Sequence, residues 1–341
     1  MNVQTKLFTI VSICFISFLG FFSCSDDDDS DLLGNWIRRS DFGGTLRSDA
    51  SCIVIGRKAY VIAGYNGKQR LKDVWEYDID RGYWTQKADL PAAGRSSAFA
   101  FASEDRGYFG TGYDGNNYYN DFWEYNPNNN EWLKRADFPG AERYGATAFY
   151  LNGVGYAGTG TGSNYYLDFY KYDPATDTWE TGVSIQGSKR AFATNFIIDN
   201  KAYVVGGVNN GGYVYDFWMF DPETQTWQEK AYITNRTDDD FDDDYTSIAR
   251  ANTVAFVING YGYLATGDFS GLNSNTWEYN PTTDRWVERT SFEGSARTAA
   301  VGFAIDDRAF VLTGRGSTTQ TTLYFDDMWE LRPRDEYNEY D

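Results

Sequence analysis

Residues 190–227 read RAFATNFIIDNKAYVVGGVNNGGYVYDFWMFDPETQTW, and this stretch contains the unit from which the fold is built. Two short apolar runs, 196–198 and 202–205, flank an Asp-Asn pair that is typical of a tight hairpin turn. A third run, 216–220, ends at an Asp-Pro turn, and a fourth begins at the tryptophan that closes the stretch. Runs of this length and period predict four short antiparallel strands.

The same unit recurs along the chain, as the spacing of its tryptophans indicates. Successive tryptophans that open the fourth run are 48, 48, 47, 48 and 59 residues apart, namely Trp36, Trp84, Trp132, Trp179, Trp227 and Trp286. An arginine follows each of them, 11 residues later in five cases and 23 in one, namely Arg47, Arg95, Arg143, Arg190, Arg250 and Arg297. A glycine stands 17 residues after every arginine, at Gly64, Gly112, Gly160, Gly207, Gly267 and Gly314.

Four antiparallel strands in a repeat of about 48 residues are typical of one blade of a β-propeller. The segment from Trp36 supplies a fourth strand without the first three, and the last unit, from Arg297, lacks a fourth. We therefore predict an all-β, six-bladed propeller over residues 33–341, in which the N-terminal strand completes the last blade and removes an unpaired sheet edge.

These repeats resemble the kelch family of the galactose oxidase/kelch-like superfamily. The resemblance rests on a glycine-ended second strand followed by Trp-x-aromatic-Asp/Asn-Pro and a further Trp, and it covers residues 33 to about 332. One departure is clear: the double glycine of kelch repeats survives only as Gly206-Gly207, and in the other units the first glycine is replaced, by Ala63, Thr111, Thr159, Thr266 and Thr313. The resemblance implies a kelch-type propeller that binds a partner on one face.

The N-terminal residues predict export. Lys6 is the only charged residue before Asp26, and the apolar run 7–22 is shorter than the roughly 20 residues of a membrane-spanning helix. Ser23-Cys24 resembles the end of a lipoprotein signal, although Phe21 stands where leucine is usual. We expect a signal peptide at 1–23, lipid attachment to Cys24 and an acidic tether at 24–32; ordinary cleavage is the alternative.

The tether, with Asp26 to Asp29 in succession, resembles that of Bacteroidetes-type surface lipoproteins. This predicts an outer-membrane lipoprotein exposed at the cell surface, with the periplasmic side as the alternative, and contact with the membrane only through the lipid.

Charge and composition exclude several functions. The net charge of −19 argues against a nucleic-acid partner. The sequence contains no histidine, which removes Ser-His-Asp catalysis and the histidine-ligated copper of galactose oxidase. We expect no cofactor and no resident metal; a calcium site formed by Asp238, Asp240, Asp242 or Asp244 is a weaker alternative.

The candidate site lies on one mouth of the propeller. The loops between second and third strands are long and rich in Tyr, Asn and Gly, and we place the insertion before Arg250 on the same mouth. The ligand-binding residues expected there are Arg47, Arg95, Arg143, Arg190, Arg250, Arg297, Tyr65, Tyr113, Tyr118, Tyr165 and Tyr166. Alternatively, the arginines pair with backbone or carboxylate groups at the blade junctions. The aspartate before each third-strand tryptophan is expected to accept hydrogen bonds from backbone donors in the preceding loop.

Tyrosine, asparagine and glycine in loops around a pocket favour binding of a glycan, or of a peptide or surface protein. We expect a monomeric binding propeller rather than an enzyme. A sugar mutarotase or epimerase resembling N-acetylneuraminate epimerase is the alternative, and a purely structural subunit is a third possibility.

Overall fold

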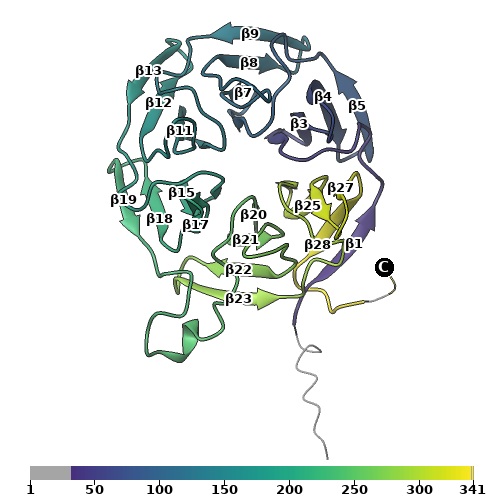
Figure 1. Ribbon diagram of the computed structural model, residues 1–341, viewed down its shortest axis with the longest axis vertical. Coiled ribbons are helices and arrows are strands. Elements are labelled where there is room, and N and C mark those ends of the chain that lie inside the picture. Colours follow the sequence, from purple (N-terminus) through teal and green to yellow (C-terminus); the bar gives the residue numbers. More distant parts are fainter. Residues whose placement is uncertain (1–31, 339, 341) are drawn as a thin grey trace, which may run out of the picture. The chain divides into compact units, whose positions relative to one another are not determined.

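The computed structural model describes residues 32–338 and 340, which fold into β-strands and one short 3-10 helix, η2 (Asp240–Asp242). Six four-stranded antiparallel sheets stand in a ring about a central axis (Figure 1). The prediction of an all-β, six-bladed propeller is therefore confirmed. The expected signal peptide, Cys24 and the tether up to residue 31 lie outside the described residues. No helix within the described part is long and apolar enough to cross a membrane.

Each blade runs from an inner to an outer strand in chain order, except at the junction of the chain ends. Blade 1 contains β2 (Ser51–Ile55), β3 (Lys58–Tyr65), β4 (Arg70–Asp78) and β5 (Tyr83–Lys87). Blade 2 contains β6 (Phe99–Ala102), β7 (Gly107–Gly110), β8 (Phe122–Asn126) and β9 (Glu131–Arg135). Blade 3 contains β10 (Thr147–Leu151), β11 (Val154–Gly158), β12 (Phe169–Asp173) and β13 (Thr178–Thr181).

The second half of the ring repeats this order. Blade 4 contains β14 (Thr194–Ile198), β15 (Lys201–Val205), β18 (Phe217–Asp221) and β19 (Thr226–Glu229). Blade 5 contains β20 (Val254–Ile258), β21 (Tyr261–Ala265), β22 (Thr276–Asn280) and β23 (Arg285–Arg289). Blade 6 contains β24 (Val301–Ile305), β25 (Arg308–Leu312), β28 (Met328–Arg332) and β1 (Asn35–Arg39).

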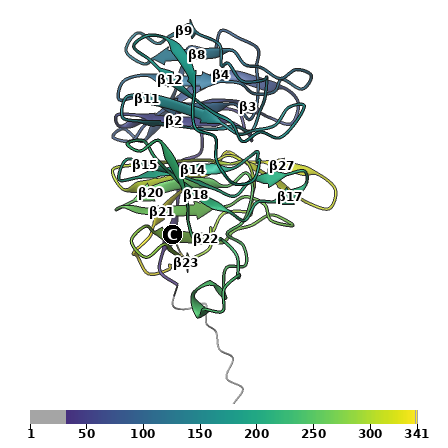
Figure 2. The same ribbon diagram turned by 90° about the vertical axis from the view of Figure 1, so that its left-hand side faces the viewer.

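The loops between second and third strands carry secondary structure of their own in two blades. β16 (Val208–Asn209) pairs with β17 (Gly212–Tyr213), and β26 (Arg315–Ser317) pairs with β27 (Thr322–Tyr324). Figure 2 shows β17 and β27 on the same face of the ring, which we call the loop-rich mouth.

The N-terminal strand completes the last blade, as predicted. β1 pairs antiparallel with β28 over five residues, from Asn35 opposite Arg332 to Arg39 opposite Met328. The main chain of Leu33 also accepts a hydrogen bond from Thr290 N of blade 5, at 3.2 Å. Within β1 itself, the Trp36 indole donates to Thr290 O at 3.3 Å, so the N-terminal segment joins the last two blades as well as the two ends of the fold.

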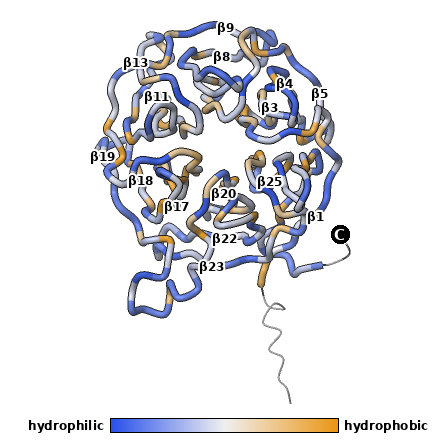
Figure 3. Tube along the Cα trace, viewed as in Figure 1, coloured by the Kyte–Doolittle hydropathy of each residue, from blue (hydrophilic) through white to orange (hydrophobic). Residues whose placement is uncertain are grey.

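The core lies between neighbouring blades rather than inside one. Tyr77 of blade 1, for example, packs against Phe303 and Phe310 of blade 6, with ring centroids 6.1 and 6.0 Å apart. The outer strands are more exposed and mostly polar, and Figure 3 shows hydrophilic colours along β9 and β23. Aromatic side chains therefore act as wedges that fill the space between twisted sheets.

The glycine 17 residues after each arginine is required by close packing. At Gly64 the backbone has φ +107°, and a Cβ there would lie 2.8 Å from the carbonyl oxygen of Ser48. In four blades a threonine stands directly before this glycine, in place of the first glycine of the kelch pair. These threonines have a left-handed φ of 58–64°, namely Thr111, Thr159, Thr266 and Thr313. The double-glycine conformation is thus retained without the glycine.

The acidic insertion does not reach the loop-rich mouth, contrary to our expectation. It lies outside the ring beside β23 (Figure 1). Phe241 packs against Arg285, whose guanidinium carbon is 4.6 Å from the ring centroid. The Tyr245 hydroxyl accepts a 2.7 Å hydrogen bond from Trp286 N on the outer strand. The apolar side chains of the insertion pack against β23, the edge strand of blade 5. This packing shields the strand edge and holds the insertion beside it.

We expect Trp36→Ala to lower the free energy of unfolding by about 3–5 kcal/mol, since this side chain is fully buried between blades 5 and 6. Arg38→Ala, on the same strand but half exposed, should change it far less. Denaturant unfolding of the two variants measures the difference. Equal effects would mean that β1 does not close the ring through its packing.

Candidate functional site

The six repeat arginines are interior residues. Each has 0% of its surface exposed. Five of them pair with the aspartate that stands two residues before the third-strand aromatic residue, namely Asp73, Asp121, Asp168, Asp216 and Asp327. In blade 1, two nitrogens of Arg47 donate to the two carboxylate oxygens of Asp73, both at 2.7 Å. The same carboxylate accepts a 2.7 Å hydrogen bond from the Trp75 indole.

The arginine side chain also donates to backbone carbonyls of two segments of its blade, one before the first strand and one at the end of the second. In blade 1, Arg47 Nε donates to Thr45 O and Nη1 donates to Ala63 O, both at 2.9 Å. The guanidinium thus ties the entry to the first strand to the end of the second and the start of the third. The aspartates were expected to accept from backbone donors, and in blade 4 Asp216 does accept from Ser188 N, at 2.8 Å. The partners that recur between blades are the arginine and, in three blades, the tryptophan.

In two of the arginines, burial lowers the pKa because it disfavours the charged guanidinium. Burial lowers the pKa of Arg190, against the opposing effect of Asp216, and lowers that of Arg250 to about 9. Arg250 faces Asn275 where the other blades have aspartate, and it donates instead to the carbonyl oxygens of Ser247, Thr266 and Asn275.

Because these guanidinium groups are buried and internally paired, the geometry favours the structural alternative for Arg47, Arg95, Arg143, Arg190, Arg250 and Arg297. A ligand would have to displace each aspartate or backbone partner from a site without solvent access.

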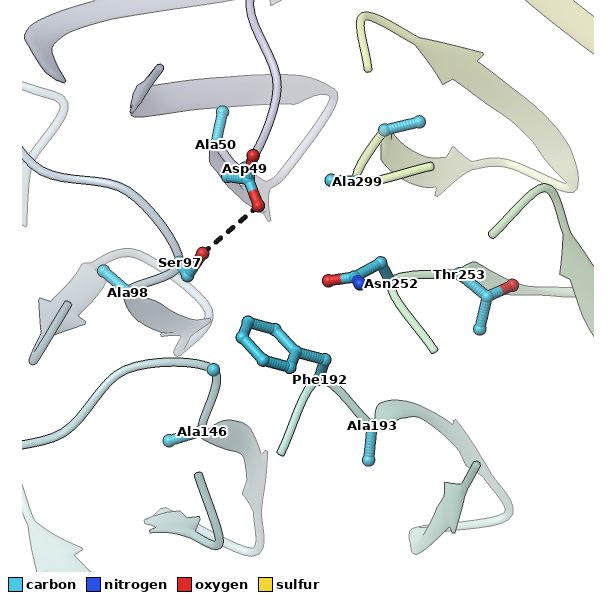
Figure 4. A pocket seen from close by; sticks show the side chains of 12 residues that line it. Asp49, Ala50, Ser97, Ala98, Ala146, Phe192, Ala193, Asn252, Thr253 and Ala299 are labelled. Carbon is cyan, nitrogen blue, oxygen red and sulfur yellow. Dashed lines mark hydrogen bonds between the residues drawn. The ribbon is translucent and has the colours of Figure 1, made fainter. Parts of the chain in front are cut away.

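The residue two positions after each arginine faces the central axis. These residues, which we call the channel ring, are Asp49, Ser97, Gly145, Phe192, Asn252 and Ala299. The N–H group of each donates to the carbonyl of its counterpart in the preceding blade, at 2.8–3.1 Å, so that six hydrogen bonds form a closed circle. All six have a left-handed φ of 51–62°. In Figure 4, the side chains of Asp49, Ser97, Phe192 and Asn252 converge on the axis.

A cavity of about 370 Å³ lies between the channel ring and the loop-rich mouth; we call it the mouth cavity. All six blades contribute to its lining, which consists of Asp49, Tyr65, Arg70, Ser96, Ser97, Tyr113, Tyr144, Phe192, Asn252, Arg315 and Tyr324. A second, smaller space of about 130 Å³ is lined by the channel ring and the residues that follow it.

One side of the mouth cavity is aromatic. Tyr113, Tyr118 and Tyr144 form a cluster with ring centroids 5.2–5.4 Å apart, and Tyr118 and Tyr144 lie nearly parallel, at 9°. Phe192 continues this cluster toward the axis, edge-on to Tyr144 at 5.5 Å. Burial raises the pKa of the Tyr144 hydroxyl above its ordinary value.

The other side carries the charged groups, beside a second aromatic pair, Tyr65 and Tyr324, whose ring centroids are 6.0 Å apart. Arg315 forms an ion pair with Asp49, which also accepts hydrogen bonds from Ser48 and Ser97. Arg70 lies over the rings of Tyr65 and Tyr113, with its guanidinium carbon 4.1 and 5.1 Å from the centroids. Among the ion pairs of the described residues, none involves Arg70.

The five predicted tyrosines divide into two groups. Tyr65 and Tyr113 line the mouth cavity, and Tyr118 supports its aromatic side through Tyr144. Tyr165 and Tyr166 do not line it; Tyr166 covers the guanidinium of Arg143, with the carbon 4.0 Å from the ring centroid.

Sequence reasoning missed the channel ring, Arg70, Tyr144, Arg315 and Tyr324. The sequence did contain an indication of the channel ring. The residue two positions after each arginine differs from repeat to repeat, although the arginine and the glycine of the repeat are constant. No group of three Cys, Asp or Glu residues in the described part is arranged to hold a metal. The Asp242 carboxylate instead accepts hydrogen bonds from Arg236 N and Thr237 N, both at 2.9 Å.

We expect Asp121→Asn to lower the free energy of unfolding by about 3–5 kcal/mol, because it leaves the buried charge of Arg95 without its carboxylate. Asp80→Asn, at an exposed ion pair with Arg57, is the matched control and should have little effect. Chemical denaturation at pH 7 compares the two. Equal, small effects would show that the buried pairs do not hold the blades together.

The pH dependence should follow from the same pairs. Burial acts to raise the pKa values of Asp73, Asp121 and Asp327, but the hydrogen bonds and charge of their arginines outweigh it, and the net pKa is lowered. Such carboxylates contribute stability above their unfolded pKa of about 3.9 and lose it as the pH falls through the folded value. Asp121→Asn should therefore flatten the decline of melting temperature below about pH 4.

Comparison with known proteins agrees with the propeller fold. The family model described as the KLHDC2/KLHL20/DRC7 Kelch-repeats domain matches residues 37–153 and 139–314. A solved structure entitled "Structure of YjhT" superposes with a TM-score of 0.68 at 14% identity, covering 84% of this chain and 99% of that one, which shows a shared fold. No curated protein matches the sequence. With six blades in phase and a family model that spans most of the ring, the chain belongs to the Kelch-repeats domain family.

Proposed function

We propose that this protein is a carbohydrate-binding propeller whose ligand occupies the mouth cavity. The observation that carries the proposal is that this cavity combines aromatic rings, grouped at Tyr113, Tyr144 and Phe192, with polar groups at Asp49, Asn252 and Arg70. A sugar ring offers surfaces for both kinds of group, with apolar C–H faces and hydroxyl groups around its edge.

The polar groups suit hydroxyl recognition. The Asp49 carboxylate and the Asn252 side-chain oxygen are acceptors in the channel ring, and Arg70 supplies donors. The stacking of Arg70 on Tyr65 and Tyr113 fixes the plane of its guanidinium before a ligand arrives, which reduces the entropy lost on binding. The cavity volume of about 370 Å³ falls within the range of small-molecule sites.

We further propose that the chain is exported and anchored at the outer membrane through Cys24. The support is the N-terminal sequence: a short apolar run behind Lys6, then Ser23-Cys24 and four successive aspartates. An acidic tether there would hold the propeller away from the membrane, where the loop-rich mouth is open to a glycan in the surroundings.

We expect Arg70→Ala and Tyr65→Ala each to weaken glycan binding by about 1–3 kcal/mol, because the first removes charged donors and the second removes the ring that orients them. Tyr83→Ala, on the exposed outer strand β5, should leave affinity unchanged. The measurement is a glycan array followed by calorimetry on the glycans that bind.

Two results would replace this proposal with another. Binding of peptides or a surface protein at the same mouth, without any glycan, would point to the protein-ligand alternative. Catalysed exchange of sugar anomers, followed by NMR, would point to the mutarotase alternative.

For the anchor, labelled palmitate should enter the wild-type protein in bacterial cells that process lipoproteins, and Cys24→Ala should not be labelled. Cys52→Ala, in the first strand of blade 1, is the control and should remain labelled. Labelling of Cys24→Ala equal to that of the wild type would refute this attachment site.

A further inference from the structure

Phe192 differs from the other members of the channel ring. The other five positions carry small or short polar residues, namely Asp49, Ser97, Gly145, Asn252 and Ala299, whereas Phe192 carries a large aromatic ring. It belongs to blade 4 and therefore faces Asp49 of blade 1 across the axis of a six-membered ring.

The backbone conformation at this position is unfavourable for phenylalanine. Phe192 has φ +58°, a left-handed conformation that glycine, asparagine and aspartate tolerate and bulky residues rarely adopt. The circle of hydrogen bonds imposes it, because Phe192 N donates to Gly145 O at 2.8 Å and Phe192 O accepts from Asn252 N at 3.1 Å. A bulky residue held in a left-handed conformation beside a ligand-sized cavity suggests a role in binding rather than in folding.

The neighbouring blade makes room for the phenyl ring. Gly145 has no side chain, and a Cβ on it would lie 2.8 Å from Phe192 Cε1. Tyr144 meets the ring edge-on at 5.5 Å. The ring therefore occupies the space above Gly145 and lies among the side chains that converge at the axis (Figure 4).

Phe192 also lies at the boundary between two spaces. It lines both the mouth cavity and the smaller space of about 130 Å³ along the axis. Its ring is the largest side chain of the channel ring, so it obstructs the channel more than any other member. A ligand that enters from the loop-rich mouth meets this ring at the end of its path.

We propose that Phe192 is the floor of the binding site, on which the terminal sugar of a glycan chain stacks. The inference rests on the carbohydrate-binding function proposed above. An aromatic ring facing a carboxylate holds one sugar ring by its C–H face while Asp49 accepts from its hydroxyl groups. Because Phe192 obstructs the axis beyond the stacked sugar, the chain continues toward the mouth, and the site selects chain ends over internal segments.

The test replaces Phe192 with a residue that the backbone prefers. Phe192→Asn relieves the left-handed conformation, so its melting temperature should equal or exceed that of the wild type. Its affinity for glycans that the wild type binds on an array should fall at least tenfold. The free monosaccharide that corresponds to the non-reducing end of each bound glycan should compete for the wild-type protein.

Ala299→Gly is the matched control. Ala299 belongs to the same ring, with φ +53°, but it does not line the mouth cavity. This variant should keep wild-type affinity. Together the two variants separate relief of the backbone from loss of the aromatic ring.

Each contrary outcome has a distinct meaning. Wild-type affinity in Phe192→Asn, or failure of the terminal monosaccharide to compete, would refute the role of Phe192 as the floor of the site. Neither result would contradict the carbohydrate-binding function. A melting temperature of Phe192→Asn well below that of the wild type would show that the ring serves packing, and would overturn the inference whatever the ligand. Absence of any glycan binding by the wild type would overturn both.

Discussion

The propeller depends on the hydrogen bonds and ion pairs of the buried arginine in each repeat. In five of the six repeats its side chain binds an aspartate and backbone carbonyls within its own blade, as Arg95 does with Asp121 and Thr111. Its main-chain carbonyl accepts a hydrogen bond from the glycine of the preceding blade, as Arg95 O does from Gly64 N at 2.9 Å. One residue per repeat thus fixes both the shape of a blade and its distance from the next.

This arrangement separates the residues that hold the ring from those that can serve a ligand. Two residues after the arginine, the chain closes a second circle of backbone hydrogen bonds, which requires no particular side chain. The side chains of the channel ring are free to differ, and Asp49, Ser97 and Phe192 place acceptor, hydroxyl and aromatic groups around one axis. A rigid, repeated backbone therefore presents an asymmetric site.

The buried ion pairs carry an energetic constraint as well. Removing a carboxylate from such a pair leaves a charge without solvent, which costs far more than losing an exposed pair. Arg250 shows a tolerated exception, since carbonyl oxygens replace the missing aspartate and burial lowers its pKa to about 9. Four threonines in left-handed conformations show a similar tolerance, since the surrounding ring imposes the backbone that kelch glycines adopt without strain.

Sequence alone determined the blade count, the strand order and the closure by β1, because these follow from the period of apolar residues and from which strands are missing at each end. It also located the mouth whose cavity Tyr65 and Tyr113 line. Only the tertiary structure decided that Arg47 and its counterparts face inward, since a repeated arginine reads the same whether it points at solvent or at an aspartate about 26 residues away. The channel ring likewise exists only after six distant segments converge on one axis, which no local pattern encodes.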